Sequence, residues 1–277
     1  MMQKKRRINL TPSGIYLGLI LLFMYLPVVV VVIYSFNVSK SDIQWLGFTL
    51  DWYKKMANNR VLMDALKNSL ILAVCACSVS AVIGTIGAVG LARWSFRSKG
   101  LLENLAILPI MIPEIILGMV FLAFFSFLRL PFGMFTLIIG HTSFCIPYIF
   151  LVVKGRLVGL DPAISEAARD LGATETRMFF DITLPLIAPA VLSGTLLAFA
   201  MSLDDVVISF FVTGAQTNTL PIKIYSSIKF GVTPEINALC TVMLLITFSL
   251  IFVAGKIATK GTNTSSNANT TMMEENR

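Results

Sequence analysis

The sequence predicts an all-α integral membrane protein with six transmembrane helices, and three observations lead to that fold class. Hydrophobic residues make up 56% of the 277 residues, whereas charged residues make up only 13%. The mean hydropathy is +0.81, far above the value typical of soluble proteins. Long apolar runs alternate with short polar segments that hold the basic residues. A soluble domain of this length does not bury so much apolar surface, so lipid is expected to cover much of it.

Six apolar runs are each long enough to cross the hydrocarbon core of a bilayer as a helix. They lie at about 15–33, 69–92, 105–128, 133–153, 186–212 and 236–258. The first run follows a basic cluster at 4–7, an arrangement that is also typical of a signal peptide. It is too long for the apolar part of a signal peptide, however, and no small-residue cleavage site follows it. We therefore expect an uncleaved membrane anchor.

The third span is expected to begin irregularly. Pro109 and Pro113 lie four residues apart near its start, where each removes a backbone donor from the helical ladder. The first turns of this segment, at 101–108, are therefore expected to lie separately at the membrane interface. The fifth span is predicted at 186–212.

The basic residues predict the orientation. Most of the 22 lysines and arginines lie in the amino-terminal segment and in the segments that follow the second, fourth and sixth spans. Because cytoplasmic segments carry an excess of Lys and Arg, both termini are predicted to be cytoplasmic. We predict a basic leader at 1–13, a six-helix transmembrane domain at 14–260 and a disordered tail at 261–277, which is rich in Asn, Thr and Ser.

Several functional classes are excluded by the same composition. The net charge of +7 is spread between apolar runs without an aromatic-rich basic patch, which favours contact with anionic lipid over binding of nucleic acid. The four cysteines lie inside apolar runs, as buried residues do, and His141 is the single histidine, so no metal site is predicted. We expect His141 to be a hydrogen-bonded packing residue. No phosphate-binding GxxxxGK[ST] motif and no catalytic constellation is present in the sequence, so no catalytic residues are predicted.

The segment at 154–185 is the most polar part of the middle of the chain. The Asp-Pro pair at 161–162 predicts a helix start, since aspartate caps a helix and proline suits its first position. The helix is expected to end at Gly172, a candidate for the left-handed conformation. A second short helix at 175–182 is expected to break at the Leu-Pro pair at 184–185. Two short helices joined by a glycine turn would form a knob that docks into a partner.

The spacing within this segment resembles the EAA motif of ABC-importer permease subunits. The matching residues are Glu166, Ala167, Ala168, Gly172, Ile182, Leu184 and Pro185. In that family the loop forms the coupling helices that seat in a cleft of the ATPase subunit. The resemblance therefore implies that these residues couple the chain to ATP hydrolysis. An amphipathic loop lying on the membrane surface is the alternative interpretation of the same residues.

Nearly the whole chain, apart from its basic leader and polar tail, resembles the spermidine/putrescine permeases of this family. The resemblance is carried most clearly by 202–214, 220–226 and 232–239. It implies a type I ABC importer permease fold in the bacterial inner membrane, and a chain that is not itself an enzyme. It implies four kinds of partner: an ABC ATPase dimer, a second homologous six-helix permease, an extracytoplasmic polyamine-binding protein and membrane lipid. No cofactor is expected on this chain, and ATP with Mg would be used by the ATPase.

The acidic residues inside apolar spans give an independent indication of the cargo. Asp204 and Asp205 lie in the fifth span and Glu114 in the third, and neither span contains a basic residue. A charge at membrane depth costs at least about 2.5–3.5 kcal/mol, so it is expected to face a cavity or a partner. Unpaired acids suit a polycation, and aromatic side chains can add cation–π contacts. The predicted pathway residues are Asp204, Asp205, Glu114, Tyr148, Phe210 and Phe211.

Alternatives to this interpretation remain at both the residue and the functional level. The acids can instead hydrogen-bond backbone groups or the second permease, or cap a broken helix. The cargo can instead be iron(III), thiamine or an anion, although an anion would call for basic residues along the pathway. A stand-alone channel or secondary carrier is disfavoured, because it would have no use for a docking loop.

Overall fold

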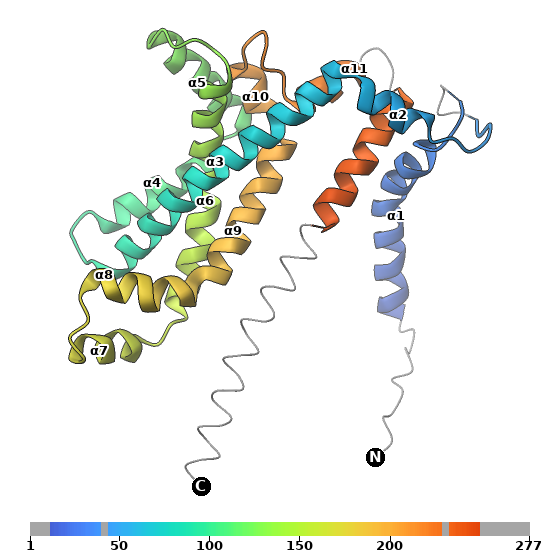
Figure 1. The fold of residues 1–277 in the computed structure, drawn as a ribbon. Helices are drawn as coiled ribbons and strands as arrows, with labels where there is room; N and C mark the ends of the chain where they lie inside the picture. The colour runs from blue at the N-terminus through green and yellow to red at the C-terminus, as the bar shows by residue number, and fades with distance from the viewer. Residues whose placement is uncertain (1–11, 40–43, 229–232, 250–277) are drawn as a thin grey trace, which may run out of the picture. The chain divides into compact units, whose positions relative to one another are not determined.

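The computed structural model describes residues 12–39, 44–228 and 233–249. Within these ranges the chain is almost entirely helical (Figure 1), and an isolated bridge between Asn37 and Phe48 is the only strand-like pairing described there. The chain divides into two compact units, one formed by 1–59 with 230–245 and the other by 60–229 with 246–277. The predicted leader and tail lie largely or wholly outside the described residues.

The apolar helices agree with the predicted membrane spans. Within the described ranges, four helices are long and apolar enough to cross a membrane, and a bent pair of helices makes a fifth candidate. A further apolar helix, Pro234–Ser249, is shorter, and the predicted span at 236–258 continues past it into residues outside the description. An all-α membrane fold is confirmed, and the described helices are compatible with six spans.

The first unit joins α1 (Pro12–Tyr34) to α2 (Asp51–Asn58) through a loop built around Asn37. The buried Asn37 amide donates to the Gln44 carbonyl at 2.7 Å, and the Trp52 indole donates to the Asn37 carbonyl at 2.6 Å. These bonds satisfy polar groups that would otherwise be buried without partners. They fix α2 against the end of α1.

The second unit is built on three long helices: α3 (Arg60–Arg93), α6 (Met134–Val158) and α9 (Leu184–Asp204). Figure 1 shows α3 and α9 alongside α6. Glycines bring the helices close: a Cβ at Gly84 would lie 3.1 Å from the Ile146 carbonyl oxygen, and one at Gly194 would lie 3.1 Å from the Cα of Ile149. Small residues allow such close packing in membranes, where burial of apolar surface does not drive helices together.

The third predicted span is broken, as its prolines indicate. It consists of α4 (Lys99–Met111) and α5 (Glu114–Phe127), which meet at an angle of 105°. Pro113 lies at the break and cannot donate to the helical ladder. An ion pair between Lys154 Nζ and Glu103 Oε2, at 2.7 Å, ties α4 to α6. The separate first segment is confirmed, and its position at the membrane interface stays a prediction.

The polar loop contains α7 (Pro162–Asp170) and α8 (Glu175–Arg177). The predicted break at the Leu-Pro pair at 184–185 is wrong, because α8 continues through a π-helical turn, Met178–Thr183, directly into α9. A π turn changes the local backbone pairing, so the ladder continues past Pro185, which has no N–H to donate. Residues 175–204 therefore form a single helix.

The fifth predicted span, at 186–212, is interrupted near its end. Helix α9 ends at Asp204, the backbone of Asp205 is extended with φ −66° and ψ 120°, and α10 (Val207–Val212) follows. A loop then leads to α11 (Leu220–Ile228), which contacts α3. In Figure 1, α10 and α11 lie at the end of this unit opposite α7 and α8.

Candidate functional site

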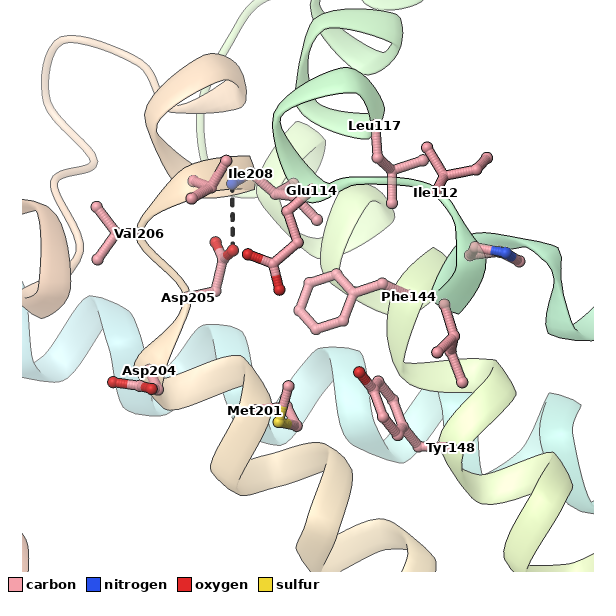
Figure 2. A pocket seen from close by; sticks show the side chains of 13 residues that line it. Ile112, Glu114, Leu117, Phe144, Tyr148, Met201, Asp204, Asp205, Val206 and Ile208 are labelled. Carbon is pink, nitrogen blue, oxygen red and sulfur yellow. Dashed lines mark hydrogen bonds between the residues drawn. The ribbon is translucent and has the colours of Figure 1, made fainter. Parts of the chain in front are cut away.

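A pocket of about 220 Å³ lies where the two broken helices meet. Its walls come from the end of α4, the start of α5, the middle of α6 and the break between α9 and α10 (Figure 2). Apolar side chains such as Ile112, Leu117 and Phe144 form much of the lining, together with the acids Glu114, Asp204 and Asp205. None of the 13 lining residues is basic. The pocket is therefore a small apolar chamber with three carboxylates.

Asp205 ends one helix and begins the next. Its Oδ1 accepts a hydrogen bond from the backbone N–H of Ile208 at 3.1 Å, and its Oδ2 accepts one from that of Ser209 at 2.8 Å. The first N–H groups of a helix have no partner within it, and a carboxylate at this place satisfies them and complements the helix dipole. The side chain is only 6% exposed. Asp205 therefore caps α10 while it also lines the pocket.

His141 lies behind this cap. The imidazole is fully buried, with Nδ1 2.8 Å from Ser202 Oγ and Nε2 2.9 Å from Ser209 Oγ. Nε2 also lies 3.4 Å from Asp205 Oδ2. The hydrogen-bonded packing residue expected from the sequence is thus the centre of a polar network at the helix break.

Glu114 and Tyr148 reach the pocket from the other side. Glu114 is the first residue of α5, directly after Pro113, and Tyr148 lies half-buried on α6. Figure 2 shows the Glu114 carboxylate and the Tyr148 hydroxyl extending into the space in front of the α9–α10 break. Within the described ranges Glu114 forms no hydrogen bond or ion pair. Its carboxylate can therefore accept a hydrogen bond from a bound cation.

Asp204 differs from its neighbour. It is the last residue of α9, it is exposed, and Figure 2 shows its carboxylate on the side of the break away from Tyr148. In the described part of the chain it makes no hydrogen bond or ion pair. Asp204 therefore presents a free carboxylate at the edge of the pocket.

The two phenylalanines predicted for the pathway lie on α10, outside the pocket lining. Phe210 is 60% exposed, whereas Phe211 is partly buried and its ring packs against Gly118 of α5 and against the apolar core. The aromatic side chains that line the pocket are Phe144 and Tyr148. Sequence reasoning missed Phe144 because it lies in a run that is apolar throughout, without a feature that separates it from core residues.

The predicted coupling residues gather at the opposite end of the unit. Glu166 and Ala167 are exposed on α7, and Ala168 is buried. Asp161 caps α7 by accepting from the Ala163 N–H at 2.9 Å, as its sequence predicts. Further along, Ile182 and Leu184 are half-buried, and Pro185 is exposed.

The turn after α7 requires glycine. Gly172 has φ +77°, its N–H donates to the Arg169 carbonyl, and the Ala173 N–H donates to the Ala168 carbonyl. This pair of bonds is the Schellman motif, in which glycine takes the left-handed position. The predicted left-handed glycine is confirmed, and its effect is to turn the chain from α7 into α8.

Arg93 and Glu175 hold the loop against α3 and were not found from the sequence. Glu175 Oε2 lies 3.1 Å from Arg93 Nη1, and its Oε1 lies 3.0 Å from Arg169 Nη2. Arg93 also donates to the buried Thr183 hydroxyl in the π turn. A basic residue at a helix end is common, so no sequence pattern distinguishes Arg93 from other such residues.

These features together indicate a membrane transport subunit: a bundle of apolar helices, an acidic pocket at two helix breaks and an exposed helical loop. The chain belongs to the family described as "Binding-protein-dependent transport system inner membrane component", whose sequence pattern matches residues 80–260. The predicted resemblance to this family is confirmed. Within the described ranges, no group of three His, Cys, Asp or Glu side chains is placed to hold a metal ion.

Two relatives are similar over most of the chain. The spermidine/putrescine transport system permease protein PotC of Escherichia coli (strain K12) is 39% identical over 251 residues, which cover 90% of this chain and 95% of the relative. The putrescine transport system permease protein PotI of the same strain is 43% identical over 229 residues, covering 80% of this chain and 82% of the relative.

Solved structures share the fold at low sequence identity. A chain from a bacterial ABC transporter for the import of alginate aligns with a TM-score of 0.68 and 14% identity, covering 93% of this chain and 98% of that one. A chain of the MetNI methionine ABC transporter aligns with a TM-score of 0.60 and 19% identity, covering 72% and 95%. The predicted ABC importer permease fold is therefore confirmed.

Proposed function

We propose that this chain is the membrane-spanning permease subunit of an ATP-driven importer of polyamines. The observation that carries the proposal is the pocket, which holds three carboxylates and has no basic residue among its 13 lining residues. Ammonium groups of a polyamine can take the place of the absent basic partners and form charge-assisted hydrogen bonds. The names of the relatives PotC and PotI, which refer to spermidine and putrescine, support the same cargo.

The lining suits a cation with an apolar chain. Glu114 and Asp204 offer carboxylates that the described residues leave unpaired, while Leu117 and Phe144 provide apolar surface for methylene groups. The faces of Phe144 and Tyr148 can add cation–π contacts, each worth about 0.5–2 kcal/mol. An anionic cargo is less well supported, because each helix start at the pocket carries an acid: Glu114 lies in the first turn of α5, and Asp205 caps α10.

The partner subunits of the transporter are proposed from the exposed loop and from the family. An ABC ATPase dimer, using ATP and Mg, would dock on α7, and a second six-helix permease would complete the membrane pathway. An extracytoplasmic binding protein would deliver the polyamine. Both termini would lie in the cytoplasm of a bacterial cell, and this chain would not hydrolyse ATP itself.

The proposal is tested by uptake in proteoliposomes that contain the full transporter with its partner subunits. Labelled spermidine and putrescine should accumulate with ATP, whereas sulfate, iron(III) and thiamine should neither accumulate nor compete. Accumulation of one of these three in place of polyamine would replace the cargo assignment.

Glu114→Gln tests the contribution of a pocket carboxylate in the same uptake assay. It removes a pocket charge that has no partner among the described residues, so assembly should be unchanged while polyamine transport weakens by about 1.5–3 kcal/mol, or roughly 10- to 150-fold. Asp64→Asn, which changes an exposed acid at the start of α3 outside the pocket, should leave transport within about twofold. Equal uptake by wild type and Glu114→Gln would remove Glu114 from the cargo site.

A further inference from the structure

The His141 side chain connects three separate backbone segments. It extends from α6, its Nδ1 contacts Ser202 near the end of α9, and its Nε2 contacts Ser209 in α10. It is fully buried and is absent from the pocket lining. The imidazole therefore holds both sides of the helix break from behind.

The same contacts close a ring around Asp205. The backbone N–H of Ser209 donates to Asp205 Oδ2, while the Ser209 hydroxyl pairs with His141 Nε2, which is itself 3.4 Å from Asp205 Oδ2. The carboxylate is thus held by α10 on one side and by His141 on the other. Its remaining side lines the pocket.

Filling space between helices does not require this chemistry. Leucine could occupy much of the volume of His141 without polar atoms, whereas the imidazole supplies two nitrogens on opposite edges of one ring. Serine hydroxyls both donate and accept, so either neutral tautomer of His141 keeps both serine contacts. Buried polar networks of this kind fix one geometry, because any broken bond leaves a buried group unsatisfied.

We infer that His141 is a positioning residue for the cargo pocket: it holds the α9–α10 break in the geometry that presents the Asp205 carboxylate to the cargo, without touching the cargo itself. The inference rests on the proposed polyamine pathway. It follows that loss of His141 should weaken recognition of the cargo through Asp205.

The test compares His141→Leu with His141→Gln in reconstituted transporters. His141→Leu removes both hydrogen bonds, and the apparent KM for spermidine should rise at least tenfold per assembled complex. His141→Gln keeps one donor and one acceptor, so it should restore KM to within about threefold of wild type. Ser143→Ala serves as the control, because among the described residues the Ser143 hydroxyl bonds only the Ile139 carbonyl of its own helix; its KM should be unchanged.

A double variant tests the route through Asp205. If His141 acts through that carboxylate, His141→Leu combined with Asp205→Asn should have a KM within about threefold of that of Asp205→Asn alone. An unchanged KM in His141→Leu would overturn the inference. Equal losses of uptake in the Leu and Gln variants, accounted for wholly by a smaller amount of assembled complex, would also overturn it. That result is expected of a purely structural role. Failure of wild type to transport polyamine would instead overturn the proposed function, and this inference with it.

Discussion

At the scale of single residues, two adjacent aspartates have different environments. Asp205 is 6% exposed in its side chain and accepts hydrogen bonds from two backbone N–H groups, whereas Asp204 is exposed and has no such partner among the described residues. The sequence predicted that acids here would serve either the pathway or a helix cap. In the structure Asp205 caps α10, and the carboxylate of Asp204 has no partner among the described residues.

The first prediction separates these two aspartates. Asp205→Asn replaces a buried capping carboxylate with a neutral amide, so it should destabilise the start of α10 by about 1.5–3 kcal/mol and reduce the amount of assembled complex. Asp204→Asn removes only a free charge and should leave assembly unchanged while uptake falls. Quantitative purification with the ATPase, followed by uptake per complex, measures both effects. Wild-type uptake and affinity in both variants would leave the acidic pathway without support.

The second prediction concerns Gly172. A β-branched side chain at φ +77° is strained even though an added Cβ would meet no heavy atom within 4 Å beyond the neighbouring residues, so Gly172→Val should cost about 1–2 kcal/mol through the backbone alone. The turn between α7 and α8 would be displaced, and binding-protein-stimulated ATPase activity and uptake should fall together.

Two further variants control for this result. Gly155→Val introduces the same side chain into open space on α6 and should have little effect. Gly172→Asn should retain more activity than Gly172→Val, because asparagine tolerates the left-handed region. Normal uptake in Gly172→Val would remove the turn from the coupling assignment.

At the scale of secondary-structure elements, the sequence predicted most helices but only some of their breaks. Pro113 correctly indicated the bend between α4 and α5, and the aspartate cap and Gly172 correctly bounded α7. Pro185 wrongly suggested a break, because a π turn accommodates it. The break at Asp205 carries no proline or glycine. It depends on His141 of α6, which contacts Ser202 and Ser209 on the two sides of the break and lies 3.4 Å from Asp205 Oδ2. Local patterns do not reveal a contact with a helix so distant in the sequence.

The third prediction tests the link between α3 and the loop. Glu175 joins Arg93 and Arg169, and Arg93 is largely buried, with 18% of its side chain exposed. Because Glu175 is 58% exposed, its ion pairs should contribute no more than about 1 kcal/mol to stability. Arg93→Met should therefore leave assembly nearly intact but loosen α8, so that fewer polyamine molecules are transported per ATP hydrolysed.

A charge exchange provides the control for this link. Arg93→Glu combined with Glu175→Arg should recover part of the transport lost in either single reversal. The recovery should be incomplete, because Thr183 would still lack its Arg93 donor and the new arginine would face Arg169. The ratio of uptake to ATP hydrolysis is the quantity to compare. An unchanged ratio in Arg93→Met would show that the link is not needed for coupling.

At the scale of the whole molecule, the apolar spans and the basic segments were predictable because membrane insertion depends on composition and length. The pocket was not predictable as a whole, since it is formed by three segments, at 109–117, 144–148 and 201–208, that are far apart in the sequence. Its acids were found only because a charge in an apolar run is costly and therefore unusual. Phe144 and Met201 line the same pocket, yet they resemble any other apolar residue.

The last prediction concerns the orientation of the whole chain. The basic cluster at 4–7 and the excess of Lys and Arg after the second, fourth and sixth spans should hold both termini in the cytoplasm. A green fluorescent protein joined after Arg277 should fluoresce, because it matures in the cytoplasm, and alkaline phosphatase at the same site should be inactive. Phosphatase fused within the loop after α5, at residue 131, should be active, since the third span ends outside. Replacing the four basic residues at 4–7 with glutamine should give a mixed orientation. Alkaline phosphatase joined after Arg277 should then be active in part of the population. Active phosphatase after Arg277 in the unaltered chain would mean an odd number of spans or an inverted chain, and either would contradict a cytoplasmic carboxyl terminus.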